Sequence, residues 1–295
     1  MFSHFAICLF KPIFNPMNNF LILIECADKV GLVALITRIL AEHNLNITAM
    51  REFVDEHARC FFTRIECASL PENEPELLRE LRNALPENAR ISINPKKEKC
   101  AAVLVTKEYH CLADILIRHF FNTLNANVCC VIGNYENLRS FTERFSIPYH
   151  FVDHQNKSKE EFENKVSEAL KPYNPDYLVL AKFMRILSPE FVDRYPQRII
   201  NIHHSFLPAF IGANPYKQAY QRGVKLIGAT AHFVTNDLDE GPIIAQKIIP
   251  VNHTFGVADM AVAGKEVEKS VLSKAMNLVF QDRVFVAGNK TIVFE

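Results

Sequence analysis

Apolar and polar positions in the first part of the chain follow two periods, one typical of strands and one typical of helices. Short runs rich in Leu, Ile, Val and Phe predict four β-strands, at 19–26, 47–54, 59–67 and 90–93. Helical spacing predicts two helices, one over 73–85 and one that carries Leu32, Leu35, Ile36, Ile39 and Leu40. The resulting βαββαβ order predicts a ferredoxin-like domain over residues 19–94.

A short charged segment with one proline, 95–100, is expected to link this domain to a second one over 101–295. There, strand and helix patterns alternate. Strands are predicted at 101–105, 128–132, 149–152, 177–180, 199–202 and 229–234, and helices at 110–120, 136–145, 159–170 and 257–280. The early strands are almost continuously apolar, as expected when helices cover both faces of a sheet. We therefore expect an α/β fold with a doubly wound, mostly parallel sheet that binds ligands beyond the carboxyl ends of its strands.

Composition narrows the classes of function. Lys and Arg total 33, as do Asp and Glu, so the formal net charge is zero. A nucleic acid is not expected as a partner, because proteins that bind one carry a basic excess. No apolar run reaches the ~18 residues of a membrane helix, and the N-terminal tail over 1–18 lacks the flanks of a signal peptide. We expect a cytoplasmic protein that does not associate with a membrane. The eight cysteines show no C-x-x-C spacing, so reduced thiols are expected, without a metal site.

The turn after the strand at 101–105 is not typical of a nucleotide site. Residues 106–110 read TKEYH and contain no glycine. A dinucleotide fold would have G-x-G-x-x-G in this turn, and Walker A is also absent from the chain. The turn has no glycine-rich nest for a phosphate monoester, and Glu108 would repel one. Nicotinamide and P-loop chemistry are therefore not expected.

Three polar residues are predicted to meet near the ends of two strands. Asn201 and His203 are two positions apart, so their side chains point to the same side of a strand. Asp239 lies in a turn marked by Gly241-Pro242. An amide can stabilise an oxyanion, and a carboxylate can hold a water molecule or pass its proton, so the trio suits attack on a carbonyl. Taken singly, the same residue types are common in turns and as hydrogen-bonded core histidines.

Longer strings around these residues resemble known active-site segments. The strings are NIHHSFLPAFIGANPY at 201–216, GATAHFV at 228–234, LDEGP at 238–242 and FMRILS at 183–188. They are similar to segments of the folate-dependent formyl transferases and hydrolases. The resemblance implies hydrolysis of 10-formyltetrahydrofolate to formate and tetrahydrofolate, with folate as the substrate and no separate cofactor or metal ion.

The same resemblance implies roles for individual residues. Asn201, His203 and Asp239 match the catalytic trio of the family. The segment that lines the pterin pocket is matched by Met184, Arg185, Ile186 and Leu187, and the site is flanked by His232 and Val234. His232 would either act directly or orient a neighbour through a hydrogen bond. His204 stands where transferases of the family usually carry proline, and it either marks a hydrolase or only supports its neighbours.

The segment from Cys26 to Leu32 resembles the strand-to-helix turn of ACT domains, which are small ligand-sensing modules. Asp28 can cap the helix that follows, and Gly31 lets the backbone approach a ligand or a partner subunit. The resemblance implies an effector site at Asp28, Gly31 and Leu32, an amino-acid effector such as methionine or glycine, and a homo-oligomer. Gly31 also has a simpler explanation, in which it only relieves crowding.

Two other functions stay open beside hydrolysis. A folate-dependent formyl transferase that acts on glycinamide ribonucleotide would have to grip a phosphate, for which the first turn lacks a suitable loop. A non-catalytic amino-acid sensor would not need the full trio. The sequence therefore favours a hydrolase in which Asn201 and His203 stabilise the oxyanion and Asp239 positions the water and relays its proton. Its formate would supply purine synthesis and balance the one-carbon pool.

Overall fold

The computed structural model describes residues 20–209 and 215–295. The chain divides into two compact units, with the division between Pro95 and Lys96. Each unit has its own main sheet. The tail predicted for 1–18 lies outside the described residues.

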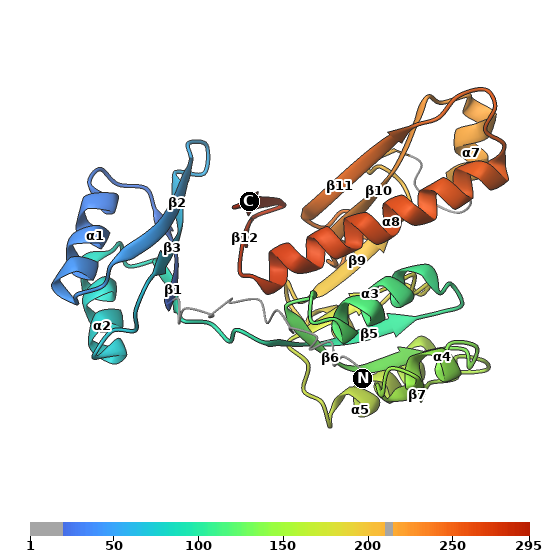
Figure 1. Ribbon diagram of the computed structural model, residues 1–295, viewed down its shortest axis with the longest axis horizontal. Helices are drawn as coiled ribbons and strands as arrows, with labels where there is room; N and C mark the ends of the chain where they lie inside the picture. Colours follow the sequence, from blue (N-terminus) through green and yellow to red (C-terminus); the bar gives the residue numbers. More distant parts are fainter. Residues whose placement is uncertain (1–19, 210–214) are drawn as a thin grey trace, which may run out of the picture. The chain divides into compact units, whose positions relative to one another are not determined.

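The first unit is a four-stranded antiparallel sheet with two helices on one face (Figure 1). Its strand order is β2-β3-β1-β4. The elements are β1 (Phe20–Ala27), α1 (Leu32–Glu42), β2 (Ile47–Asp55), β3 (Cys60–Cys67), α2 (Glu74–Ala84) and β4 (Arg90–Ile93). Alternate residues of β1 are buried, because side chains along a strand point to opposite faces. The predicted βαββαβ arrangement is confirmed.

The start of α1 differs from the prediction that Asp28 caps it. The N-cap residue is Gly31, with a φ of 90°, and no side chain of the described residues caps the first turn. Asp28 lies before the helix, and its backbone N–H donates to the carbonyl of Arg59. The capping prediction was wrong because the chain turns at Gly31, in a left-handed conformation that glycine adopts without strain.

The second unit is built on a seven-stranded sheet with helices on both faces (Figure 1). Its strand order is β11-β10-β9-β8-β5-β6-β7. The strands are β5 (Lys99–Val105), β6 (Ala126–Gly133), β7 (Tyr149–Phe151), β8 (Tyr177–Leu180), β9 (Ile199–His203), β10 (Leu226–Phe233) and β11 (Ile243–Pro250). β10 pairs antiparallel with both of its neighbours, β9 and β11, and the other neighbouring strands of this sheet pair parallel. The predicted α/β, doubly wound, mostly parallel sheet is confirmed.

The helices of the second unit form two layers around this sheet. They are α3 (His110–Phe120), α4 (Arg139–Glu143), α5 (Lys159–Leu170), α6 (Pro189–Val192), α7 (Pro215–Arg222) and α8 (Val257–Phe280). Val103 of β5 packs in the core that contains α3 and α8, whereas its neighbour Leu104 packs in the core that contains α5 and α6. A separate hairpin follows α8, formed by β12 (Val284–Ala287) and β13 (Lys290–Val293). This layering places α8 along β9, which carries Asn201 and His203, and along β10, which precedes the loop that contains Asp239.

The helix predicted over 136–145 is shorter than expected. α4 spans Arg139–Glu143, because the chain first makes a tight turn in which the Arg139 N–H donates to the carbonyl of Glu136. Glu136 could belong either to a turn or to the first turn of a helix, so the sequence pattern did not fix the residue at which α4 begins.

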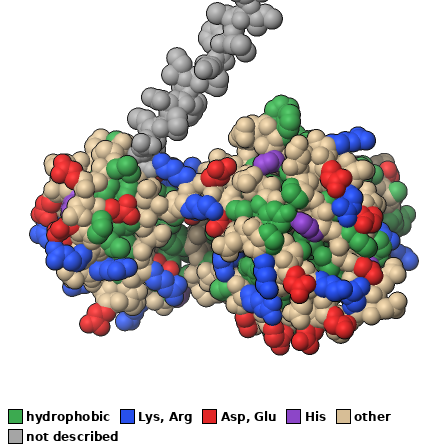
Figure 2. Space-filling model, turned by 90° about the horizontal axis from the view of Figure 1, so that it is seen from below, with side chains coloured by type: hydrophobic (Ala, Val, Ile, Leu, Met, Phe, Trp, Pro, Cys, Tyr) green, Lys and Arg blue, Asp and Glu red, His purple; other side chains and the backbone are tan. Residues whose placement is uncertain are grey.

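Charged side chains are mixed rather than separated on the face drawn in Figure 2, where Lys and Arg are interspersed with Asp and Glu. The formal net charge of zero therefore does not conceal one large basic face on that side. In the described ranges, every helix is too short or too polar to cross a bilayer.

Candidate active site

A cavity of about 740 Å³ lies where β8 and β9 end, next to the loop that joins β10 to β11. Its lining includes every residue predicted for the site in the second domain, namely Asn201, His203, Asp239, Met184, Arg185, Ile186, Leu187, His232 and Val234. The position agrees with the expectation that this fold binds ligands beyond strand ends. The volume is in the range of small-molecule binding sites.

Asn201 and His232 face each other across neighbouring antiparallel strands. They are paired in the register of β9 and β10, and Asn201 Nδ2 lies 3.1 Å from His232 Nε2. His232 Nδ1 lies 2.9 Å from the backbone oxygen of Phe233. Because a carbonyl oxygen only accepts, Nδ1 carries the ring proton of a neutral His232, and Nε2 accepts from the amide. With this tautomer, the atom of the Asn201 amide that faces His232 Nε2 is the nitrogen, because it must donate the hydrogen bond.

Asp239 joins this pair to His203. Its Oδ1 lies 3.2 Å from His203 Nδ1 and 3.7 Å from His232 Nε2. The hydrogen bond from His203 and the proximity of His232 outweigh burial and hold the pKa of the Asp239 carboxyl well below its usual range. The turn depends on Gly241, since a Cβ there would lie 1.8 Å from the backbone oxygen of Phe233. Asp239 is therefore an ionised carboxylate held against two imidazoles.

His203 keeps one ring nitrogen for the cavity. Nδ1 is occupied by Asp239, whereas Nε2 is buried and has no hydrogen-bond partner among the described residues. Buried polar atoms without a partner are rare in folded proteins, so such an atom in a cavity wall indicates contact with a ligand or a water molecule. Asn201, His203 and Asp239 are thus brought together as predicted, with His232 hydrogen-bonded behind Asn201.

The segment after β8 gives the cavity an apolar side. Met184 and Ile186 are about 59% and 62% exposed and line the cavity. The Met184 backbone N–H donates to Thr106 Oγ1 at 3.0 Å, which ties the segment to the turn after β5. The Arg185 guanidinium lies over the ring of Phe162, 5.4 Å from its centroid, and its side chain is half-buried. Exposed apolar side chains on a fixed backbone suit a flat aromatic ligand.

The structure adds a buried polar cluster that the sequence analysis did not assign to the site. Glu268 on α8 is about 1% exposed. Its Oε2 lies 2.7 Å from His110 Nε2 and 3.3 Å from Lys182 Nζ. Its Oε1 accepts a 2.7 Å hydrogen bond from the Tyr216 hydroxyl. Burial raises the pKa of this carboxyl, but the His110 hydrogen bond, the Lys182 charge and the Tyr216 hydrogen bond outweigh burial and lower the pKa to about 2.

One signal in the sequence could have pointed to this cluster. Glu268 is a charged residue among the buried apolar positions of α8, and Lys182 follows a buried strand. Charged residues at apolar positions are fully buried only when paired. The sequence does not give the partners of Glu268, which come from three separate segments.

His110, Cys111 and Glu268 are the described residues whose geometry could suit a metal ion. Their ligand atoms all lie within 4.8 Å of one another. The sequence analysis saw no such cluster, because Glu268 is far from the other two in the chain. Burial raises the pKa of the Cys111 thiol, and both oxygens of Glu268 already have partners. In the structure, hydrogen bonds and ion pairs hold Glu268 and His110 together.

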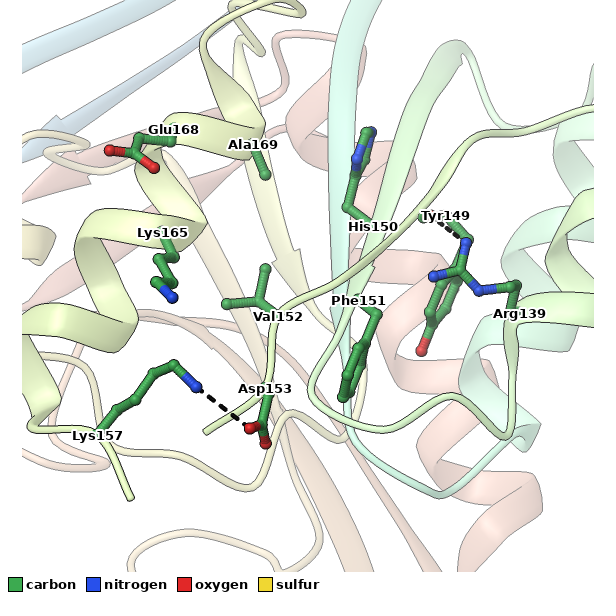
Figure 3. A pocket seen from close by; sticks show the side chains of 10 residues that line it. All are labelled: Arg139, Tyr149, His150, Phe151, Val152, Asp153, Lys157, Lys165, Glu168 and Ala169. Atoms are coloured by element: carbon green, nitrogen blue, oxygen red, sulfur yellow. Dashed lines mark hydrogen bonds and ion pairs between the residues drawn. The ribbon is translucent and has the colours of Figure 1, made fainter. Parts of the chain in front are cut away.

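A second cavity, of about 580 Å³, lies beside β7 and α5 (Figure 3). Its charged side chains are partly paired with one another. Arg139 Nη1 donates to the Tyr149 carbonyl at 3.0 Å, and Lys157 Nζ lies 3.2 Å from Asp153 Oδ2. None of the predicted site residues lines this cavity. The candidate active site is therefore the larger cavity.

The residues predicted for an effector site differ in exposure. Asp28 and Gly31 are exposed at the turn before α1. Leu32 is buried, at about 4% exposure, and its side chain belongs to the core of the first unit. A ligand at this turn would therefore meet the backbone of Gly31 rather than the side chain of Leu32.

Comparison with known proteins links both units to described families. The ACT domain family matches residues 20–83, and the formyl transferase family matches residues 99–276. The chain is 51% identical over 273 residues to a formyltetrahydrofolate deformylase of Haemophilus influenzae, covering 92% of this chain and 98% of that one. It is 52% identical over 268 residues to one from Escherichia coli K12, covering 91% and 95%.

Solved structures give the same result. A formyltetrahydrofolate deformylase from Pseudomonas syringae matches with a TM-score of 0.90 and 40% identity over 96% of both chains. A glycinamide ribonucleotide transformylase from Symbiobacterium toebii matches 68% of this chain, with a TM-score of 0.65 and 29% identity. The resemblance inferred from the sequence is thereby confirmed. The chain belongs to the family of formyltetrahydrofolate deformylases, which are hydrolases with an ACT domain and a formyl transferase fold.

Proposed function

We propose that the protein hydrolyses 10-formyltetrahydrofolate to formate and tetrahydrofolate, with Asn201, His203 and Asp239 as its catalytic residues. The observation that carries the assignment is the unpartnered Nε2 of His203 in the wall of the larger cavity. The ring is held on its other side by an ionised carboxylate. A fixed imidazole with a free nitrogen is suited to a hydrogen bond with the oxygen of a bound formyl group.

The formyl group on the folate nitrogen is amide-like, so attack by water passes through a tetrahedral oxyanion. In this proposal His203 is protonated and donates from Nε2 to this oxygen, while Asp239 contacts its Nδ1. Asn201 donates one N–H to His232 and keeps its second N–H for the oxyanion. Loss of one such donor typically costs about 100- to 1,000-fold in kcat.

Asp239 positions the attacking water and relays its proton. With a pKa well below the usual range, this carboxylate is a weak base that does not store the proton. The proton passes on to the folate nitrogen as the carbon–nitrogen bond breaks. The water oxygen becomes part of formic acid, which ionises to formate, so atoms and charge balance without a separate cofactor.

The remaining cavity residues bind and orient the substrate in this scheme. Met184, Arg185, Ile186 and Leu187 place their backbone along the pterin ring, and Val234 flanks it. His232 is an orienting residue, because its hydrogen bonds to Asn201 and to the Phe233 carbonyl fix the amide.

Regulation and cellular role form a second layer of the proposal. The ACT domain suggests an amino-acid effector such as methionine or glycine, received at the turn around Gly31. We also expect the protein to form a homo-oligomer, to be cytoplasmic and to bind neither nucleic acid nor membranes. The released formate would supply purine synthesis and balance the one-carbon pool.

Formate release is the direct test. The purified protein is incubated with 10-formyltetrahydrofolate alone, and formate and tetrahydrofolate are assayed. We expect equal amounts of both products. A glycinamide ribonucleotide transferase would turn over only after that acceptor is added, and a non-catalytic sensor would show no turnover in either case. Either outcome would overturn the proposed function.

A further inference from the structure

His204 faces the same cavity as His203 but has no role in the scheme above. The two rings are stacked, with centroids 5.1 Å apart and planes inclined by 27°. On its other side lies the ring of Tyr216, 6.5 Å away between centroids. No residue in the described ranges forms a hydrogen bond with the His204 ring. The ring therefore lines the cavity without a hydrogen-bond partner among the described residues.

The surroundings of His204 keep its ring neutral. Burial, the charge of Lys182 and the proximity of His203 lower its pKa to about 4, whereas Glu268 and Asp239 act in the opposite direction with less effect. A neutral imidazole has one N–H and one nitrogen lone pair. The lone pair can accept a hydrogen bond from a water molecule, which a protonated ring cannot do.

The wall behind His204 is fixed by the cluster around Glu268. The Tyr216 hydroxyl donates to Glu268, which is also held by His110 and Lys182. Tyr216 reaches α8 at Gly264, where a Cβ would lie 2.0 Å from the Tyr216 hydroxyl oxygen. The Tyr216 hydroxyl is thus engaged with Glu268, and the His204 ring beside it lines the cavity.

We propose that His204 is the residue that selects water as the formyl acceptor. The proposal rests on the hydrolysis proposed above. One O–H of the attacking water donates to the neutral His204 ring, and the other donates to Asp239. The water oxygen bonds to the formyl carbon, the water proton that Asp239 relays passes to the folate nitrogen, and the carbon–nitrogen bond breaks. A larger amine acceptor would need the space that His204 and Tyr216 fill.

The test compares the wild-type protein with His204→Phe, which keeps a stacked ring and removes both nitrogens. Formate is measured with 10-formyltetrahydrofolate alone, and then with hydroxylamine as a small competing acceptor that yields formohydroxamate. We expect kcat for hydrolysis to fall at least about tenfold, with KM for the folate within about twofold. We also expect the ratio of formohydroxamate to formate to rise at least about fivefold, because water has lost its hydrogen bond.

A purely structural role for His204 gives a different result, since both products then fall together and their ratio is unchanged. His204→Gln, which restores a hydrogen-bond acceptor, should recover part of the hydrolysis rate. His253→Phe makes the same change at an exposed histidine outside both cavities and should leave rate and ratio unchanged. If the wild-type protein releases no formate, the proposed function fails. If it does and His204→Phe matches it in rate and ratio, only the role of His204 is overturned.

Discussion

Replacing Glu268 by Gln tests how the polar cluster stabilises the second unit. The carboxyl has a pKa lowered from 4.5 to about 2 in the folded protein, and its side chain is almost fully buried. By linkage, this difference stabilises the folded state by about 3 kcal/mol at pH 7. Gln keeps the volume but loses the charge, so Lys182 and His110 remain buried beside a neutral amide. Breaking a buried ion pair from one side typically costs about 3–5 kcal/mol, which agrees in size.

The stabilisation by Glu268 depends on pH, and it is expected to decrease as the pH falls. Because the folded pKa lies below the unfolded value, the stabilisation is complete above pH 4.5 and is lost as the pH falls toward 2. At pH 3 the difference between wild type and Glu268→Gln should shrink to about 1 kcal/mol. The sequence contains no Trp, and two units need not unfold together. Urea unfolding is therefore followed by pulsed hydrogen exchange in peptides from α8.

Glu266→Gln is the matched control. It lies on the same helix, about 69% exposed, and pairs with Lys269 three residues later. An exposed pair of this kind contributes at most about 0.5 kcal/mol, so this variant should unfold almost like the wild type at both values of pH. A loss below about 1 kcal/mol for Glu268→Gln at pH 7, or an equal loss at pH 3 and pH 7, would refute the linkage argument.

Three further substitutions probe other parts of the structure. Gly241→Ala places a Cβ against the Phe233 carbonyl, so we expect the Asp239 turn to shift and kcat to fall at least about tenfold; unchanged steady-state kinetics would contradict the geometry. Asn201→Ala should lower kcat about 100- to 1,000-fold while equilibrium titration finds folate affinity little changed, and a loss confined to KM would count against an oxyanion donor. In Gly31→Ala the added Cβ has no atom within 4 Å, but alanine is strained at a φ of 90°. The free energy of unfolding of the first unit, measured in urea, should therefore fall by about 1–2 kcal/mol. Equal stability would contradict that backbone conformation.

Hydrophobic periodicity predicted much of the fold because most elements bury one face. The helix bounds at His110–Phe120, Lys159–Leu170 and Val257–Phe280 and the strand at Tyr177–Leu180 agree with the structure. β11 was not predicted, since Ile243–Pro250 carries apolar residues without a clear period of two or of 3.6. Its pairing with β10 decides its conformation, and pairing is a long-range property that a local pattern does not contain.

The residues of the candidate site that lie close together in the sequence were also predicted more readily than those that only the fold brings together. Asn201 and His203 were predicted together because two positions on one strand share a side, and Asp239 because its turn is part of a longer string. The Glu268 cluster was missed, since its partners come from distant segments and no spacing links them. The Asp28 cap was a local rule that failed because Gly31 allowed a later turn.

The catalytic role of Asp239 is tested most directly by hydrolysis in water labelled with ¹⁸O, using the wild type and Asp239→Asn. Wild-type protein should release formate that contains one labelled oxygen, because the attacking water supplies one of its two oxygens. Asp239→Asn, which keeps the size of the side chain, should bind the folate with similar affinity and release labelled formate at a rate lower by at least about 100-fold. Labelled formate released by Asp239→Asn at the wild-type rate would contradict the account.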